Sequence, residues 1–81
     1  MRIRTLFFAS YRDIAGAEQL DVVLPAGSRV ADLVARLRAG EGRWAELPER
    51  PAVAINLTYA PLSAVLAEGD EVAFIPPVSG G

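Results

Sequence analysis

The chain has 81 residues, of which 52% are hydrophobic and 22% charged, and its formal net charge is −2. This length fits one domain, and the hydrophobic content excludes a disordered chain. The sequence has no cysteine, histidine or lysine, so all eight basic residues are arginine. These absences exclude disulfides, zinc–thiolate sites, histidine bases and Schiff-base chemistry. We therefore expect no metal site and no self-contained active site.

Composition also limits where the chain acts and what it binds. No apolar run approaches the roughly 20 residues that span a bilayer. Arg12 and Asp13 interrupt the apolar stretch near the N-terminus, and no small-residue cleavage pattern precedes them. There is no stripe of basic residues of the kind that binds nucleic acid. We expect a cytoplasmic protein that binds neither membrane nor nucleic acid.

The N-terminal third predicts two strands. Residues 3–8 form an apolar run that is hydrophobic on both faces from Leu6 onward, which is typical of a central strand. Residues 10–16 predict a loop or a helical turn that Gly16 closes. A second strand is expected at 19–24, before the turn residues Pro-Ala-Gly.

The next segment predicts a helix. Ser28 is expected to cap its first turn with the side-chain hydroxyl, and Asp32 lies near the positive end of the helix dipole. Gly40 is expected to end the helix in a left-handed conformation. Four apolar residues recur on one helical face and predict its core side: Val30, Leu33, Val34 and Leu37.

The remainder predicts a connection and two returning strands. Residues 41–51 are polar and interrupted by proline and glycine, and Trp44 and Leu47 are expected to hold them on the body as a satellite cluster. A strand at 52–56 is followed by a turn and an irregular stretch. The last strand, at 71–75, is ended by two prolines.

This order of elements predicts an α+β fold with one main helix on one face of a mixed sheet. The first and last strands are the most apolar, so we expect them to be the central pair. The arrangement is that of the β-grasp fold of ubiquitin. We expect the β-grasp domain to span 1–76 and an extended tail to span 77–81.

The tail has the composition of a working segment. Pro76 and Pro77 fix φ and withhold ladder donors, so the chain is expected to leave the sheet extended. Gly80 and Gly81 have no Cβ and can enter a narrow channel in another protein. A carboxylate on Gly81 is unhindered, and in a chain without cysteine or histidine it is the one group open to activation as an acyl-adenylate.

Two segments resemble a known family. Leu6-Phe7-Phe8-Ala9, followed by Arg12 and Gly16, resembles the opening of the small subunit of molybdopterin synthase. The last sixteen residues, Leu66-Ala67-Glu68-Gly69-Asp70-Glu71-Val72-Ala73-Phe74-Ile75-Pro76-Pro77-Val78-Ser79-Gly80-Gly81, resemble the end of that family almost position for position. The resemblance covers the whole chain, although residues 39–51 match no motif.

The resemblance implies a sulfur-transfer cycle. An ATP-dependent adenylating enzyme activates Gly81, and a sulfurtransferase converts it to a thiocarboxylate. The tail, with Gly80, then enters the large subunit of molybdopterin synthase, in an expected heterotetramer, and donates sulfur to cyclic pyranopterin monophosphate to build the molybdopterin dithiolene. The catalytic side chains are expected on the large subunit. This chain would hold no permanent cofactor.

Alternation along the strands predicts a partner-binding face. If Ile3, Thr5 and Phe7 face the helix, then Phe8 faces away, as does Ile75 in the last strand. We expect these two residues to lie together, with Tyr59, on a helix-free face that the resemblance assigns to docking. The remaining expected partner contacts are Arg12, Pro76, Pro77 and Val78.

Three other functions remain open at this point. A related carrier could deliver sulfur to a tRNA base or to the thiazole of thiamin. A protein modifier could join its C-terminus to lysines of a target, although without lysine it could not form chains with itself. A β-grasp interaction domain would have no chemistry at Gly81.

Overall fold

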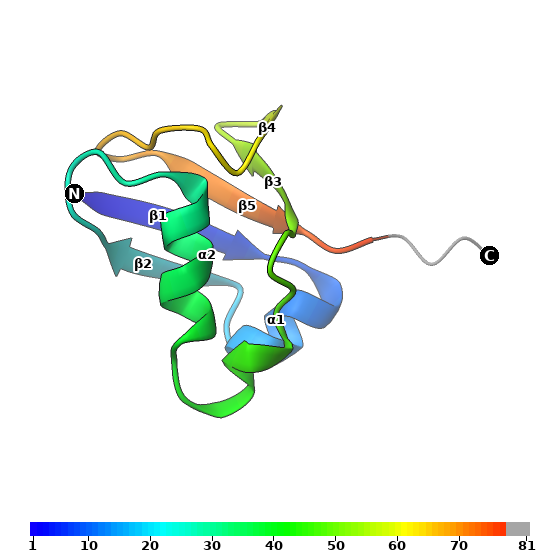
Figure 1. Cartoon of the computed structure of the whole chain (residues 1–81). Helices are drawn as coiled ribbons and strands as arrows, with labels where there is room; N and C mark the ends of the chain where they lie inside the picture. The colour runs from blue at the N-terminus through cyan, green and yellow to red at the C-terminus, as the bar shows by residue number, and fades with distance from the viewer. Residues whose placement is uncertain (78–81) are drawn as a thin grey trace.

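The computed structural model describes residues 1–77, in which a five-stranded mixed sheet carries helix α2 across one face (Figure 1). The strand order is β2-β1-β5-β3-β4. Strands β1 and β5 pair in parallel at the centre, and the other pairs are antiparallel. In chain order the elements are β1 (Arg2–Phe7), α1 (Ala9–Ala15), β2 (Gln19–Val23), α2 (Val30–Arg38), the 3-10 helix η1 (Gly42–Glu46), β3 (Ala52–Ile55), β4 (Thr58–Ala60) and β5 (Glu71–Ile75).

The predicted fold class and central pair are confirmed. The four predicted strands lie within one residue of their expected bounds, and Gly16 ends α1 with φ of 71°. No helix within residues 1–77 is long and apolar enough to span a membrane.

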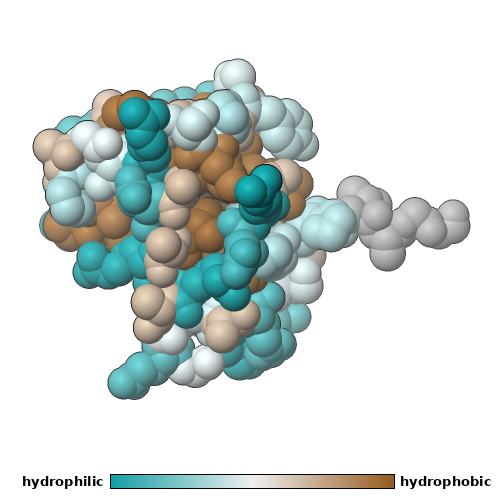
Figure 2. Space-filling view, viewed as in Figure 1, coloured by the Kyte–Doolittle hydropathy of each residue, from teal (hydrophilic) through white to brown (hydrophobic). Residues whose placement is uncertain are grey.

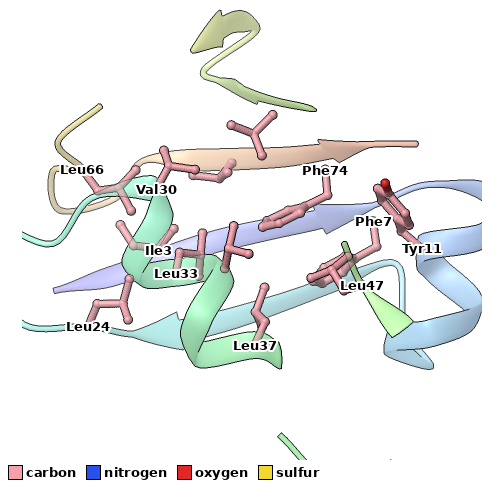
Figure 3. Close-up of a cluster of buried hydrophobic side chains, with 13 residues drawn as sticks. Ile3, Phe7, Tyr11, Leu24, Val30, Leu33, Leu37, Leu47, Leu66 and Phe74 are labelled. Carbon is pink, nitrogen blue, oxygen red and sulfur yellow. The ribbon is translucent and has the colours of Figure 1, made fainter. Parts of the chain in front are cut away.

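The core lies between the sheet and α2. In β1 and β5 the inward residues Ile3, Thr5, Phe7, Val72 and Phe74 are essentially inaccessible, as the strand alternation predicts. The rings of Phe7 and Phe74 stack with centroids 5.4 Å apart. Figure 3 shows Ile3, Phe7 and Phe74 on the side of the sheet where α2 lies. In the view from the α2 side, hydrophobic residues are visible at the surface beside this helix (Figure 2).

The prediction that Ser28 caps α2 is wrong. Its hydroxyl donates a hydrogen bond to the Pro25 carbonyl, at 2.7 Å, and so closes the preceding turn. The capping position belongs to Arg29, whose backbone N–H donates to the Asp32 carboxylate at 2.8 Å. Asp32 thus stabilises the helix start through a hydrogen bond as well as through its charge.

The prediction for Gly40 is also wrong. Ala39 ends α2 in a right-handed conformation, and Gly40 is not among the residues with positive φ. A Cβ on Gly40 would lie 2.8 Å from Cδ1 of Trp44. Glycine is required here because the indole packs against the backbone, not because the chain turns left-handed.

Residues 41–51 are more ordered than their composition predicts. They contain η1, and Trp44 packs edge-to-face on Phe7 with ring centroids 5.5 Å apart. Leu47 is 1% exposed and belongs to the main core, as Figure 3 shows, so the predicted satellite cluster is wrong. The connection completes one continuous core.

Strand β4 was not predicted. Asn56 and Leu57 adopt φ of 48° and 73°, as a tight hairpin turn requires, and β4 then pairs with β3. The Asn56 side chain holds the turn: its amide nitrogen donates to Asp70, and its oxygen accepts from the Glu71 backbone, both at 3.0 Å. Leucine in place of the usual glycine hides this hairpin in the sequence.

Candidate functional site

The helix-free face of the sheet has an apolar end. The strand registers align Leu6 with Ala73, Ala73 with Ala54, and Ala54 with Tyr59 in one row across four strands. The next row pairs Ile75 with Ala52. We call this surface the apolar patch: Leu6, Ala52, Ala54, Tyr59, Ala73 and Ile75. Tyr59 is 73% exposed, so the patch presents an aromatic ring that no other described segment covers.

The opposite end of the same face is charged. Arg4 of β1 is paired with Asp21 of β2 in the antiparallel register, and its guanidinium forms an ion pair with Glu71 at 3.8 Å. The backbone N–H of Arg2 donates to the Glu68 carboxylate. These residues border a polar cavity of about 590 Å³. One face of the sheet is therefore divided along its strands into a charged end and an apolar end.

The predicted partner residues fall into two groups. Tyr59, Ile75, Pro76 and Pro77 line one cavity of about 500 Å³, which we call the tail-base cavity because the chain toward Gly81 leaves from its rim. Phe8 lies just beyond the end of β1, 47% exposed, and lines a different cavity. The register that pairs Phe7 with Phe74 makes Phe8 and Ile75 the next residues along the two parallel strands, so the expectation that they share one site stays a prediction.

Arg12 lies beside Phe8 and has a partner within the chain. Its Nη1 is 3.1 Å from the Glu18 carboxylate, on an exposed surface. An exposed pair of this kind contributes little to stability. Arg12 would have to exchange Glu18 for a partner's carboxylate in order to bind a partner, which the sequence alone did not indicate.

The tail-base cavity is also lined by residues that the sequence did not indicate. Tyr11 comes from α1, and Pro48, Arg50 and Pro51 come from the connection before β3. Burial raises the pKa of the Tyr11 phenol above its ordinary value, so the hydroxyl is protonated at neutral pH. These segments are distant along the chain, and no signal in the sequence places the charged segment around Arg50 at the tail base.

The cavity walls are stiff. Four of the lining residues are prolines, which have fixed φ and no side-chain rotamer freedom to lose. Pro76 and Pro77 follow β5, which lies between β1 and β3. The chain therefore leaves from the centre of the sheet, anchored on both sides.

The predicted site residues Val78, Gly80 and Gly81 lie outside the described residues. Within residues 1–77 there is no group of three carboxylates that could hold a metal ion. The described part thus presents an apolar surface that continues to Pro76 and Pro77.

A β-grasp sheet with α2 across one face and a proline-led departure from its central strand defines a ubiquitin-like protein. The chain belongs to the ThiS family, whose match covers residues 5–81. It is 37% identical over 82 residues to the molybdopterin synthase sulfur carrier subunit of Mycobacterium tuberculosis, with 100% of this chain and 99% of the relative covered. The family resemblance seen in the residues is confirmed.

Two solved structures extend the comparison. SAMP1 (small archaeal modifier protein 1) from Haloferax volcanii is 29% identical, covers 100% of both chains and has a TM-score of 0.81. A protein–protein complex of subunits 1 and 2 of the molybdopterin-converting factor from Helicobacter pylori includes a chain that is 26% identical, with 100% of both chains covered and a TM-score of 0.72.

Proposed function

We propose that this chain is the sulfur-carrier subunit of a molybdopterin synthase and that its working group is the Gly81 carboxylate. The observation that carries the proposal is the full-length similarity to sulfur carrier subunits, which extends through the Gly-Gly end. The described geometry supports it, because the chain toward Gly81 departs from the central strand beside an apolar patch.

The proposed chemistry happens in partner enzymes. The Gly81 carboxylate attacks the α-phosphate of ATP in an adenylating enzyme, releasing pyrophosphate and forming an acyl-adenylate. A sulfurtransferase then supplies sulfur at the oxidation level of sulfide, which forms a bond to the acyl carbon as the bond to AMP breaks, and a thiocarboxylate remains. Two such carriers in turn give their sulfur to cyclic pyranopterin monophosphate and form the molybdopterin dithiolene. This chain retains no cofactor through the cycle.

The chain itself contributes docking and reach. We propose that the apolar patch docks on the large subunit, which provides the catalytic side chains, in a heterotetramer. Apolar side chains gathered on the surface of a small domain typically mark a protein interface. Pro76 and Pro77 direct the last residues outward, and Gly80 and Gly81 pass through a channel too narrow for a Cβ.

Reconstitution tests the proposal. The chain, loaded by its adenylating enzyme, ATP and a sulfur donor, is mixed with the large subunit and cyclic pyranopterin monophosphate, and molybdopterin is measured. The matched control lacks Gly81, which moves the reactive carbon by more than the roughly 1 Å that can cost about a hundredfold. The control should bind and transfer no sulfur. A loaded wild-type chain that forms no molybdopterin would contradict the proposal.

A second candidate function is protein modification, which the likeness to SAMP1 favours. The activated Gly81 would then form an amide with a lysine of a target protein. Incubating the activated chain with its cell extract separates the two functions: a modifier yields higher-mass adducts, whereas a dedicated carrier yields the free thiocarboxylate. Transfer to tRNA or to a thiazole precursor would appear as sulfur in those products.

A further inference from the structure

The eight arginine side chains differ in their ion pairs and hydrogen bonds. Four form ion pairs with carboxylates, and Arg29 donates to the Ser63 carbonyl. Within residues 1–77, the side chains of the other three make no ion pair or hydrogen bond: Arg2, Arg36 and Arg50. Of these three, Arg50 lines the tail-base cavity.

Within residues 1–77, no carboxylate pairs with Arg50. Its neighbour Glu49 is directed to Arg38, with the two charged groups 3.4 Å apart. Arg38 is held in turn by a 2.7 Å hydrogen bond from its Nε to the Leu47 carbonyl. None of the described residues that line the cavity is acidic, and Tyr11 is a neutral phenol there. The cavity therefore presents one positive charge.

The apolar residues of the cavity strengthen the attraction between Arg50 and an anion. Prolines, an alanine, an isoleucine and two tyrosines line the cavity together with the exposed Arg50, so a carboxylate that binds Arg50 there also meets a surface of low polarity. A charge in a cleft with low-dielectric walls acts more strongly than one on an open surface. A guanidinium can also bind a carboxylate with two parallel hydrogen bonds, which fixes the orientation of the pair.

We propose that Arg50 binds an aspartate or glutamate side chain of the synthase large subunit, which covers the tail-base cavity when the two subunits assemble. This inference rests on the proposed function. Two observations select this occupant: the positive charge, with which no carboxylate of residues 1–77 pairs, and the continuity of the cavity with the apolar patch through Ala52, Tyr59 and Ile75. The pair would lie beside Pro76 and Pro77 and would set the direction in which the last residues enter the partner.

Charge reversal on matched arginines tests the proposal. Arg50→Glu is compared with Arg36→Glu, because Arg36 also lacks an ion pair in the described part of the chain but lies on α2, away from the tail-base cavity. Affinity for the purified large subunit is measured by calorimetry at low and high salt. Arg50→Glu should weaken binding about thirtyfold or more, and Arg36→Glu by about twofold or less. Arg50→Lys, which keeps the charge but not the two-point geometry, should fall between wild type and Arg50→Glu.

The outcomes separate this inference from the proposed function. Wild type that binds the large subunit while Arg50→Glu binds equally well overturns the role of Arg50 alone. Equal losses in both reversal variants show a general charge effect and also overturn it. A loss confined to binding of the adenylating enzyme assigns the carboxylate to that enzyme and overturns the present assignment. Wild type that does not bind the large subunit overturns the proposed function together with the inference.

Discussion

The two faces of the sheet are formed by the same strands but differ in the size and burial of their side chains. In β5, Val72 and Phe74 face α2 and are inaccessible, whereas Ala73 and Ile75 face the other way and are half-buried. The face under α2 carries large side chains that pack on one another. The helix-free face is lined with alanines and bordered by Leu6, Tyr59 and Ile75, so another surface can approach it closely. A strand that is apolar on both sides therefore supplies the core with one face and, under the proposed function, a partner-binding surface with the other.

The largest expected effect lies on the core face. Phe74→Ala removes a ring that stacks on Phe7 and should cost about 3–5 kcal/mol of unfolding free energy. A chain of this size has only about 4–12 kcal/mol in total. Chemical denaturation measures the loss. Ile75→Ala, from the other face of the same strand, is the matched control and should cost clearly less; equal costs would remove the distinction between the faces.

On the helix-free face, which we propose binds the large subunit, substitutions should weaken partner binding more than they lower stability. Ile75→Asp and Phe8→Asp should each weaken binding to the large subunit by about 2 kcal/mol or more, near thirtyfold, since anchors of an interface contribute this much. Phe8 occupies the capping position of α1, where aspartate is favourable, so its variant should keep full stability. Calorimetry with the partner and a denaturation curve separate the two effects. Unchanged affinity for either variant would remove that residue from the interface.

The contact between Gly40 and Trp44 should respond to a single methyl group. Gly40→Ala places a Cβ 2.8 Å from the indole and should cost about 1–3 kcal/mol, as overpacking does. Tryptophan fluorescence reports the displaced ring, because Trp44 is the only tryptophan of the chain. An unshifted emission spectrum with full stability would show that the indole does not rest on Gly40.

The smallest effect is expected at the β3–β4 turn. Leu57 has φ of 73° and is 91% exposed, so it accepts backbone strain and buries little. Leu57→Gly should raise stability by about 1 kcal/mol, since a left-handed conformation costs a residue with a Cβ about 1–2 kcal/mol. Thermal unfolding measures the gain. A loss of stability would show that the Leu57 side chain has a packing role.

Local patterns predicted the parts of this fold that depend on neighbours in sequence. Alternation in β1 and β5 identified which residues face α2, and the apolar stripe of α2 identified its buried side. The predictions for Ser28 and Gly40 are wrong because more than one local role fits each residue. The Ser28 hydroxyl bonds to the carbonyl of Pro25, earlier in the chain, instead of capping the helix, and Gly40 makes room for the indole of Trp44 instead of ending the helix in a left-handed conformation.

The candidate site was predicted only in part, because its residues come from segments that are distant along the chain. Tyr59, Ile75, Pro76 and Pro77 were assigned to a partner face from alternation and family resemblance. Their cavity also needs Tyr11 and Arg50, which α1 and the connection before β3 bring to the tail base only after folding. Arg12 was selected for its place in a motif, but it pairs with Glu18, in the segment between α1 and β2.

The central claim is that sulfur is carried on Gly81, and mass spectrometry tests it most directly. The protein is treated with its adenylating enzyme, ATP and a sulfur donor, and its intact mass and C-terminal peptide are measured. We predict that one oxygen is replaced by sulfur and that the replacement lies on the terminal carboxyl of Gly81. Omitting ATP should leave the mass unchanged. An unmodified C-terminal peptide under full conditions, with the adenylating enzyme active on another carrier, would contradict the account.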